Sequence, residues 1–266
     1  MVSVYINEMA ETMLHKVDFQ KRIHEFDFIK GLAVLYMICN HILFDFGIAF
    51  YPSFAGTALE GFSSLCRTIH RSDASRYLTI CLCSGVFISV SGALSTLSKK
   101  RIKEGLFLAV VSLAITAVSL AASKILNTSL TIWFGILHLL AVCMLLSPLL
   151  NKIPVAVLPF LAVGAYALGL YFRTVVAPTP FLTVFNMKSP GFYSADYYPV
   201  LPYVGFYLFG IFCGKCFYRE KRSRLPLLGK KVFLPVRFLG GYSFAVYVLH
   251  QPVVYAIVWL LSVLVR

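Results

Sequence analysis

The sequence predicts an all-α, polytopic membrane helix bundle with about seven transmembrane helices and a cytoplasmic N-terminus. Of its 266 residues, 59% are hydrophobic and only 13% are charged, and the mean hydropathy is +0.81. A soluble domain of this length carries more polar surface, so the composition indicates an integral membrane protein. The net charge of +13 lies in short segments between apolar runs. That distribution is typical of topology signals rather than of a nucleic-acid-binding face, and we expect no nucleic-acid partner.

Seven apolar segments are long enough to cross a bilayer. No internal repeat or shift in composition marks a soluble second domain, so we expect residues 1–27 to form a cytoplasmic tail and residues 28–266 a single transmembrane domain. The tail lacks the apolar run and cleavage site of a signal peptide, and the first span is therefore expected to remain as an anchor. The predicted spans are 28–50, 76–97, 105–123, 130–150, 154–172, 199–218 and 241–264. The Pro-, Tyr- and Phe-rich connection 173–198 is expected to pack over the mouth of the bundle.

The distribution of lysine and arginine predicts the orientation. Cytoplasmic connections of membrane proteins carry an excess of these residues. With the N-terminus inside and the C-terminus outside, most of the basic residues fall on the cytoplasmic side. That orientation disfavours a receptor of the animal seven-helix kind. The inner residues are Lys16, Lys21, Arg22, Lys99, Lys100, Arg101, Lys103, Lys152, Arg219, Lys221, Arg222, Arg224, Lys230, Lys231 and Arg237, and the outer ones are Arg67, Arg71, Lys124, Arg173 and Lys188.

A polar stripe runs along the first predicted span and consists of Asp27, Lys30, His41 and Asp45. At 100° per residue these side chains fall within roughly 60° of one helix face and extend over about 27 Å, close to the thickness of a hydrocarbon core. Ionisable groups are costly in lipid, so the stripe should face the interior of the bundle or a wet cavity. We therefore expect a functional site along this helix.

Histidines occur in three of the predicted spans, at positions 41, 138 and 250, each between the midplane and the outer half of the membrane. The three are expected to be able to share one cavity. A buried histidine is more often bonded to nearby backbone than catalytic, and His250-Gln251-Pro252 also has the simpler role of satisfying carbonyls freed by the proline. His41 differs because Asp45, one turn further on, can orient its ring or stabilise its protonated form.

Small residues and cysteines have simpler interpretations. Ser84-Gly85 and Ser91-Gly92 in the second span favour close helix packing, although a slender acyl-pantetheine arm would also pass beside them. Seven cysteines, mostly in apolar runs, form no paired framework. Cys213 and Cys216 form one CxxC pair with no second pair to complete a zinc site, so no metal is expected.

Short motifs recur in order along the chain and together carry a family resemblance. They are Asp27-Phe-Ile-Lys30-Gly31-Leu-Ala33 followed by His41, then Ser91-Gly92, Phe134-Gly135-Ile-Leu-His138, Tyr198-Pro199-Val-Leu-Pro202-Tyr203-Val-Gly205, and Tyr242-Ser243 to His250-Gln251-Pro252. This ordered set resembles the heparan-α-glucosaminide N-acetyltransferase catalytic-domain family, transmembrane acyltransferases, in its short bacterial form. The resemblance extends from about residue 22 to 260. Lys30 stands where the family has an arginine, which keeps the charge but loses the bidentate fork.

The resemblance implies transfer of an acetyl or other acyl group from cytoplasmic acyl-CoA to an extracytoplasmic acceptor, a sugar amine or hydroxyl on a carbohydrate or glycolipid. It implies acetyl-CoA as donor, glycan modification as the outcome, membrane lipids as surroundings and the bacterial plasma (inner) membrane as location. By matching position, His41 is the base or acyl-handling residue. The expected catalytic residues are His41, Asp45 and Asn40; those near the donor are Lys30, Asp27, Ser84, Ser91 and Gly92; those near the acceptor are His138, Tyr203, His250 and Gln251.

Several alternatives stay open at this level. The chemistry needs a base near neutral pKa, which histidine supplies, and oxyanion donors, for which Asn40, Ser84, His138 and Tyr203 are equal candidates. Direct transfer and an acetylated His41 are both compatible with the residues. A small-molecule or proton-coupled transporter would also use a polar stripe and midplane histidines, although no inverted repeat is evident. A membrane cytochrome with bis-histidine haem is a third class. The acceptor, the acyl chain length, homo-oligomer formation and the role of residues 173–198 are not determined by the sequence.

Overall fold

The structure is a computed structural model that describes residues 22–125 and 127–265. Within these residues all regular elements are helical, and the only extended pairings are two isolated bridges. The predicted all-α class is therefore confirmed, as is the helical membrane bundle. Most of the expected tail, residues 1–27, lies outside the described residues. The first described helix begins at His24, inside the bounds expected for that tail.

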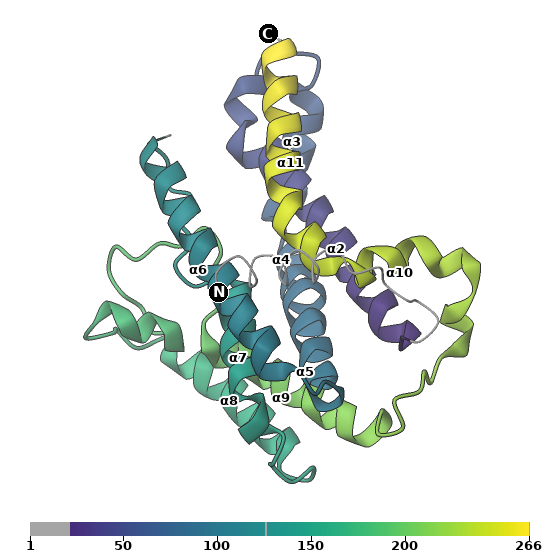
Figure 1. Ribbon diagram of the computed structural model, residues 1–266. Coiled ribbons are helices and arrows are strands. Elements are labelled where there is room, and N and C mark those ends of the chain that lie inside the picture. The colour runs from purple at the N-terminus through teal and green to yellow at the C-terminus, as the bar shows by residue number, and fades with distance from the viewer. Residues whose placement is uncertain (1–21, 126, 266) are drawn as a thin grey trace, which may run out of the picture. The chain divides into compact units, whose positions relative to one another are not determined.

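The described chain forms two compact units, here called unit 1 (22–87 with 223–265) and unit 2 (88–222). Figure 1 shows the helices of both in the colours of the chain. The helices of unit 1 are α2 (His24–Phe44), α3 (Glu60–Arg71), α4 (Asp73–Leu78), α10 (Leu234–Gly241) and α11 (Ser243–Leu264), with π-helical segments Asp45–Ala49 after α2 and Thr79–Val86 after α4. Those of unit 2 are α5 (Phe87–Leu97), α6 (Arg101–Ile125), α7 (Ile136–Leu150), α8 (Leu158–Phe172) and α9 (Val200–Phe217). Short 3-10 helices cover Tyr51–Phe54, Pro180–Phe185, Pro226–Gly229 and Lys231–Phe233.

Five of the seven predicted spans correspond to helical runs long and apolar enough to cross a membrane, counted over the described residues. They are His24–Ala49, Asp73–Leu97, Arg101–Ile125, Val200–Phe217 and Ser243–Leu264. The other two, α7 and α8, have 15 residues each, or about 22 Å, against a hydrocarbon core of about 30 Å. Helix α7 is shorter than the predicted span 130–150 because Gly135 before it is extended (φ −88°, ψ −176°).

In unit 1, α2 packs against α3, α10, α11 and the π-helical segment Thr79–Val86. The contact with α10 is close, because a Cβ on Gly240 would overlap the carbonyl oxygen of Asp27, and one on Gly31 would overlap that of Val236. Glycine at both positions thus allows the two backbones to approach without a side chain between them. This approach fixes the first turns of α2, where the polar stripe begins.

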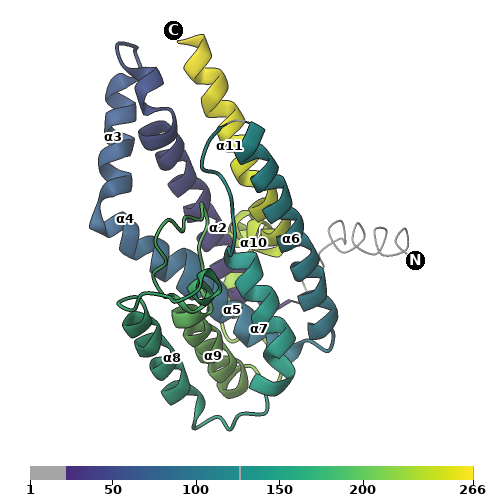
Figure 2. The same cartoon turned by 90° about the vertical axis from the view of Figure 1, so that its left-hand side faces the viewer.

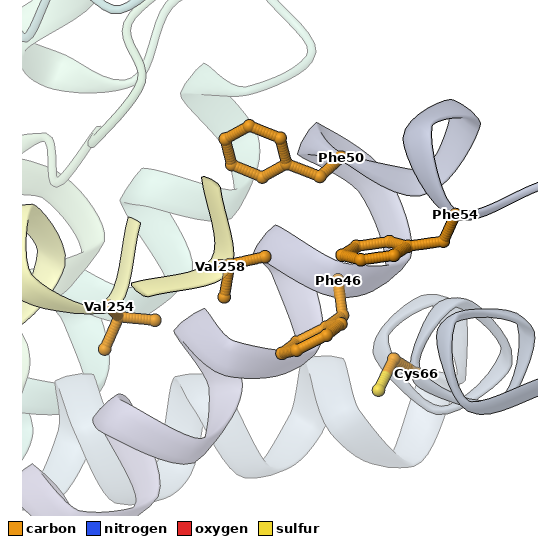
Figure 3. Packing of buried hydrophobic residues seen from close by; sticks show 6 residues of the cluster. All are labelled: Phe46, Phe50, Phe54, Cys66, Val254 and Val258. Carbon is orange, nitrogen blue, oxygen red and sulfur yellow. The ribbon is translucent and has the colours of Figure 1, made fainter. Parts of the chain in front are cut away.

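An apolar cluster in unit 1 holds the segment that directly follows α2. Phe46 and Phe54 stack with ring centroids 5.2 Å apart, and Phe54 is fully buried. Figure 3 shows this cluster, which consists of Phe46, Phe50, Phe54, Cys66, Val254 and Val258. Ser63 of α3 donates a hydrogen bond of 2.7 Å to the carbonyl of Phe46. The cluster therefore ties the π-helical segment Asp45–Ala49 to α3 and α11.

In unit 2, α6 packs on α7, while α9 packs on both α7 and α8 (Figure 2). Helix α5 meets α9 closely: a Cβ on Gly92 would overlap the carbonyl oxygen of Tyr207, and Ser89 Oγ donates to the carbonyl of Phe206 at 3.0 Å. Gly92 thus lies at a helix contact, as the packing interpretation of the small residues predicts for this position.

The connection 173–198 folds back onto the segment that precedes α7. The amide of Ala195 donates to the carbonyl of Thr131 at 2.9 Å, and that of Tyr198 donates to Phe134 at 2.8 Å. The Tyr197 hydroxyl donates to the carbonyl of Thr183 at 2.5 Å. Partial burial raises the pKa of Tyr197 to about 12. These bonds fix the extended residues before α7, which shortens that helix relative to the predicted span.

Candidate functional site

Two histidines from opposite ends of the chain meet in unit 1. The rings of His41 on α2 and His250 on α11 lie edge to face, with centroids 4.8 Å apart and an interplanar angle of 61°. His250 is 9% exposed, and His41 is half-buried. The two residues are 209 positions apart in the sequence, so only the packing of α11 on α2 brings them together.

The tautomer of His250 follows from its hydrogen bond. Its Nδ1 lies 2.6 Å from the backbone carbonyl oxygen of Tyr247. A carbonyl oxygen only accepts, so Nδ1 carries the proton and Nε2 keeps its lone pair. Nε2 is buried and has no hydrogen-bond partner among the described residues. His250 therefore presents a buried, basic nitrogen, in addition to the backbone bond that its simpler interpretation predicts.

Two further unpaired atoms belong to the same helices. His41 Nδ1 and Gln251 Oε1 are buried, and neither has a hydrogen-bond partner in the part of the chain that the structure describes. Buried polar atoms are nearly always paired, so an unpaired group calls for an explanation. Gln251 Oε1 and His250 Nε2 can only accept, and they are suited to bind a hydroxyl or amine donor.

Asp45 is directed to Gln251 rather than to His41. The Gln251 amide donates to the two Asp45 carboxylate oxygens at 3.2 and 3.4 Å, and Asp45 is fully buried. Asp45 has α-helical backbone angles (φ −65°, ψ −46°), and its N–H bonds the carbonyl of His41, so it lies one turn after His41 as the sequence predicts. The expected partnership of Asp45 with His41 is nevertheless absent from the described contacts, and Asp45 instead holds the side chain next to His250.

Asn40 lies one residue from His41 but is engaged elsewhere. Its Nδ2 donates to Ser75 Oγ and Thr79 Oγ1, both at 3.2 Å. The neighbouring Tyr36 hydroxyl donates to the Ser75 carbonyl at 2.9 Å. Both N–H groups of the Asn40 amide are therefore used within unit 1. Its catalytic assignment stays a prediction, since an oxyanion would have to displace these bonds.

The other end of the polar stripe is an ion-pair cluster. Arg22 forms a bidentate pair with Asp27, with Nε and Nη2 at 2.7 and 2.8 Å from the two carboxylate oxygens. Lys30 Nζ is 3.7 Å from the same carboxylate. Asp27 and Lys30 are 1% and 7% exposed. Arg22 thus supplies the bidentate fork that Lys30 cannot form, and its pKa is raised chiefly by its hydrogen bond to Asp27.

The remaining residues expected near the donor lie on the run from α4 to α5. Ser84 is buried in unit 1 and its Oγ lies 3.4 Å from the carbonyl oxygen of Thr79. Ser91 and Gly92 belong to unit 2, where Gly92 contacts the backbone of α9. Their assignment to the donor stays a prediction.

His138 and Tyr203 belong to unit 2, whereas the pair of histidines belongs to unit 1. His138 Nδ1 accepts the amide N–H of Gly135 at 3.1 Å, so the proton is on Nε2, which lies 3.0 Å from Thr116 Oγ1. Both ring nitrogens are therefore paired, which favours a structural role. The Tyr203 ring packs 4.9 Å from that of Tyr198. Their assignment to the acceptor stays a prediction.

Sequence reasoning did not single out His70, on α3. Its ring meets that of Phe44 with centroids 5.5 Å apart, and its Nδ1 is buried without a partner among the described residues. Burial, with a smaller contribution from Arg71, lowers its pKa below the ordinary value. The only signal in the sequence was a histidine on an amphipathic segment directly after the first span.

The fold and this site define a helical membrane protein with paired histidines beside a buried carboxylate. Residues 22–252 match the family model of the heparan-alpha-glucosaminide N-acetyltransferase catalytic domain. The chain belongs to that family, and it is a membrane acetyltransferase by family membership. The matched range includes His41, Asp45, His250 and Gln251. No curated protein and no solved structure matches the chain.

Proposed function

We propose that this protein transfers an acetyl group from cytoplasmic acetyl-CoA to an extracytoplasmic sugar amine or hydroxyl in the bacterial plasma membrane. The observation that carries the proposal is the set of unpaired acceptor atoms in unit 1, on His250 and Gln251. An attacking hydroxyl or amine is a proton donor that fits such acceptors. Family membership supports acetyl-CoA as the donor.

In the proposed reaction the acceptor O–H or N–H is held by the histidine pair. As its oxygen or nitrogen attacks the thioester carbonyl carbon, the proton moves to His41, with His250 beside it. The C–S bond then breaks, the carbonyl is restored, and the imidazolium returns the proton to the departing CoA thiolate. Atoms and charge balance without a further reactant. An acetylated His41 is the second route open to the same residues.

The neighbouring side chains have supporting roles in this proposal. Gln251, held by Asp45, fixes the position of one acceptor atom beside His250. We also propose that Asp27, Lys30 and Ser84 of unit 1, and Ser91 and Gly92 of unit 2, contact the donor. His138 and Tyr203 of unit 2 are proposed to contact the acceptor.

A first experiment measures donor binding. The purified protein is heated with acetyl-CoA, with free CoA and with no ligand, and its melting temperature is compared. A ligand present at 100 times its Kd stabilises the folded state by about 2.7 kcal/mol, which is readily seen as a shift. No shift with any short acyl-CoA, in a folded sample, would contradict the proposed donor and favour transport instead.

A second experiment measures turnover. The protein in proteoliposomes is supplied with acetyl-CoA, and the release of free CoA thiol is followed with and without a panel of amino sugars and neutral sugars. Thiol release that depends on a sugar identifies the acceptor class. Thiol release that never depends on an acceptor, together with a clear melting shift, would leave donor binding intact but contradict transfer to a sugar.

A further inference from the structure

Unit 2 contains a basic cleft that the proposed transfer reaction does not use. It has a volume of about 500 Å³ and lies where the ends of α5, α6, α7 and α9 meet. Five cationic side chains line it, and no acidic side chain does, among the residues that the structure describes. They are Arg101, Lys152, Lys215, Arg219 and Lys221.

Three of these cations are held by neutral acceptors. Lys215 Nζ donates to the carbonyl of Ile153 at 2.7 Å, and Lys221 Nζ donates to that of Leu97 at 3.2 Å. Arg101 Nε donates to the carbonyl of Ser98 at 2.8 Å. An ammonium has three donors and a guanidinium five, so each side chain is positioned while donors remain for a ligand. Backbone carbonyls also leave the positive charge without an ionic partner.

The other two cations, Lys152 and Arg219, are exposed and take part in no ion pair within the described residues. The cleft also contains an unpaired acceptor, because Asn151 Oδ1 is buried with no hydrogen-bond partner in the same described part. Like charges that converge without a counter-ion repel one another, so their gathering favours a bound anion. A general topology signal accounts for basic residues at helix ends but not for their convergence on one cavity.

Exposed apolar side chains lie on the same helices within one turn of the cleft residues. Leu145 and Leu149, near the cleft residue Pro148 on α7, are 36% and 63% exposed. Phe217, at the end of α9, is 52% exposed. Cations at a helix end beside lipid-facing apolar residues are the arrangement that binds phospholipid head groups.

We propose that this cleft is a binding site for a phosphate ester, with Lys152 and Arg219 as its free cations. The phosphate comes from an anionic phospholipid of the adjacent leaflet or from a soluble phosphate ester, and the exposed apolar side chains near the cleft favour the lipid. A glycerol head group would in addition offer hydroxyl donors to Asn151 Oδ1. The site belongs entirely to unit 2 and does not depend on the proposed transfer reaction.

The test uses the purified full-length protein and titrates dioleoyl-phosphatidylglycerol, dioleoyl-phosphatidylcholine or inorganic phosphate while the melting temperature is followed. The site variant is Lys152→Ala with Arg219→Ala. The matched control, Lys99→Ala with Lys103→Ala, removes two exposed cations that do not line the cleft. Phosphatidylglycerol should stabilise the wild type and the control, and the site variant should bind it on the order of 30-fold more weakly.

Each outcome decides the assignment. Stabilisation by inorganic phosphate alone, lost in the site variant and not increased by phosphatidylglycerol, would support the phosphate site and assign it to a soluble ester. Equal weakening in the site variant and the control, or equal stabilisation by phosphatidylcholine, would overturn the proposal. A second measurement needs no variant: phosphate should displace phosphatidylglycerol from the wild type better than chloride at equal ionic strength. Equal displacement by the two anions would also overturn it.

Discussion

The carboxylate of Asp45 accepts the side-chain amide of Gln251 at 3.2 Å, across 206 residues of sequence. Asp45 opens the π-helical segment after α2, and Gln251 follows His250 on α11. The bond thus joins the two helices that carry the histidine pair. Because Asp45 is fully buried, its carboxylate depends on this amide for hydrogen bonding among the described contacts.

Replacing Gln251 by alanine should destabilise the protein, because it leaves a buried carboxylate without its donor. We expect a loss of about 1–3 kcal/mol, measured as a lower melting temperature. Acetyl transfer should fall as well, since His250 loses its positioned neighbour. Leu249→Ala is the control, because Leu249 lies on the same helix and is 60% exposed. Equal melting temperatures for the two variants would show that the Asp45–Gln251 bond contributes nothing measurable.

The histidine pair predicts coupled losses of activity. His41→Ala should reduce acetyl transfer by about 10²–10⁴-fold, the range expected for loss of a general base, while the protein remains folded and inserted. His250→Ala should also reduce transfer, and the double variant should lose less than the product of the two single effects, because the rings are in contact. Turnover of acetyl-CoA measures all three variants. Retained transfer in His41→Ala would contradict its proposed role.

Much of the fold follows from the sequence, because long apolar runs leave few alternatives to membrane helices. Five of the seven predicted spans are recognisable as spanning helices. Helix α7 begins late because the Asp196 carboxylate accepts the N–H of Ile136 at 3.2 Å, a tertiary contact 60 residues away. Helix α3 is not recognised as a span in the sequence because charged and polar residues separate its apolar ones.

The residues that meet in unit 1 could be named from the sequence, whereas their pairings could not. Helix α2 is regular as far as Asp45, so the one-turn spacing of His41 and Asp45 assumed from the sequence is correct. The packing of α11 on α2 supplies Gln251 as the partner of the Asp45 carboxylate, and residue spacing within one helix carries no information on that partner. The free nitrogen of His250 likewise depends on a tautomer set by the Tyr247 carbonyl. Such details arise from helix packing and local backbone geometry that residue spacing does not determine.

From the burial of His70 we predict that the protein loses folding stability in mild acid. The pKa of His70 is lowered in the folded protein by burial and by Arg71, while the unfolded value is near 6.5. As the pH falls, His70 therefore takes up a proton in the unfolded chain before it does so in the folded protein. The folding stability contributed by neutral His70 is present above pH 6.5 and is lost as the pH falls. Between pH 7.5 and pH 5, the melting temperature should fall less for His70→Phe than for the wild type. Identical drops would show that His70 does not contribute.

The close approach of α10 to α2 requires glycine at position 240. A Cβ at this position would overlap the carbonyl oxygen of Asp27, so Gly240→Ala should force the helices apart and lower the stability by about 1–3 kcal/mol. Gly61→Ala on α3 is the matched control, because its Cβ would meet no atom within 4 Å. There the better helix propensity of alanine should raise stability by about 0.5–1 kcal/mol. Thermal unfolding compares the two, and a Gly240→Ala protein as stable as Gly61→Ala would contradict the close contact.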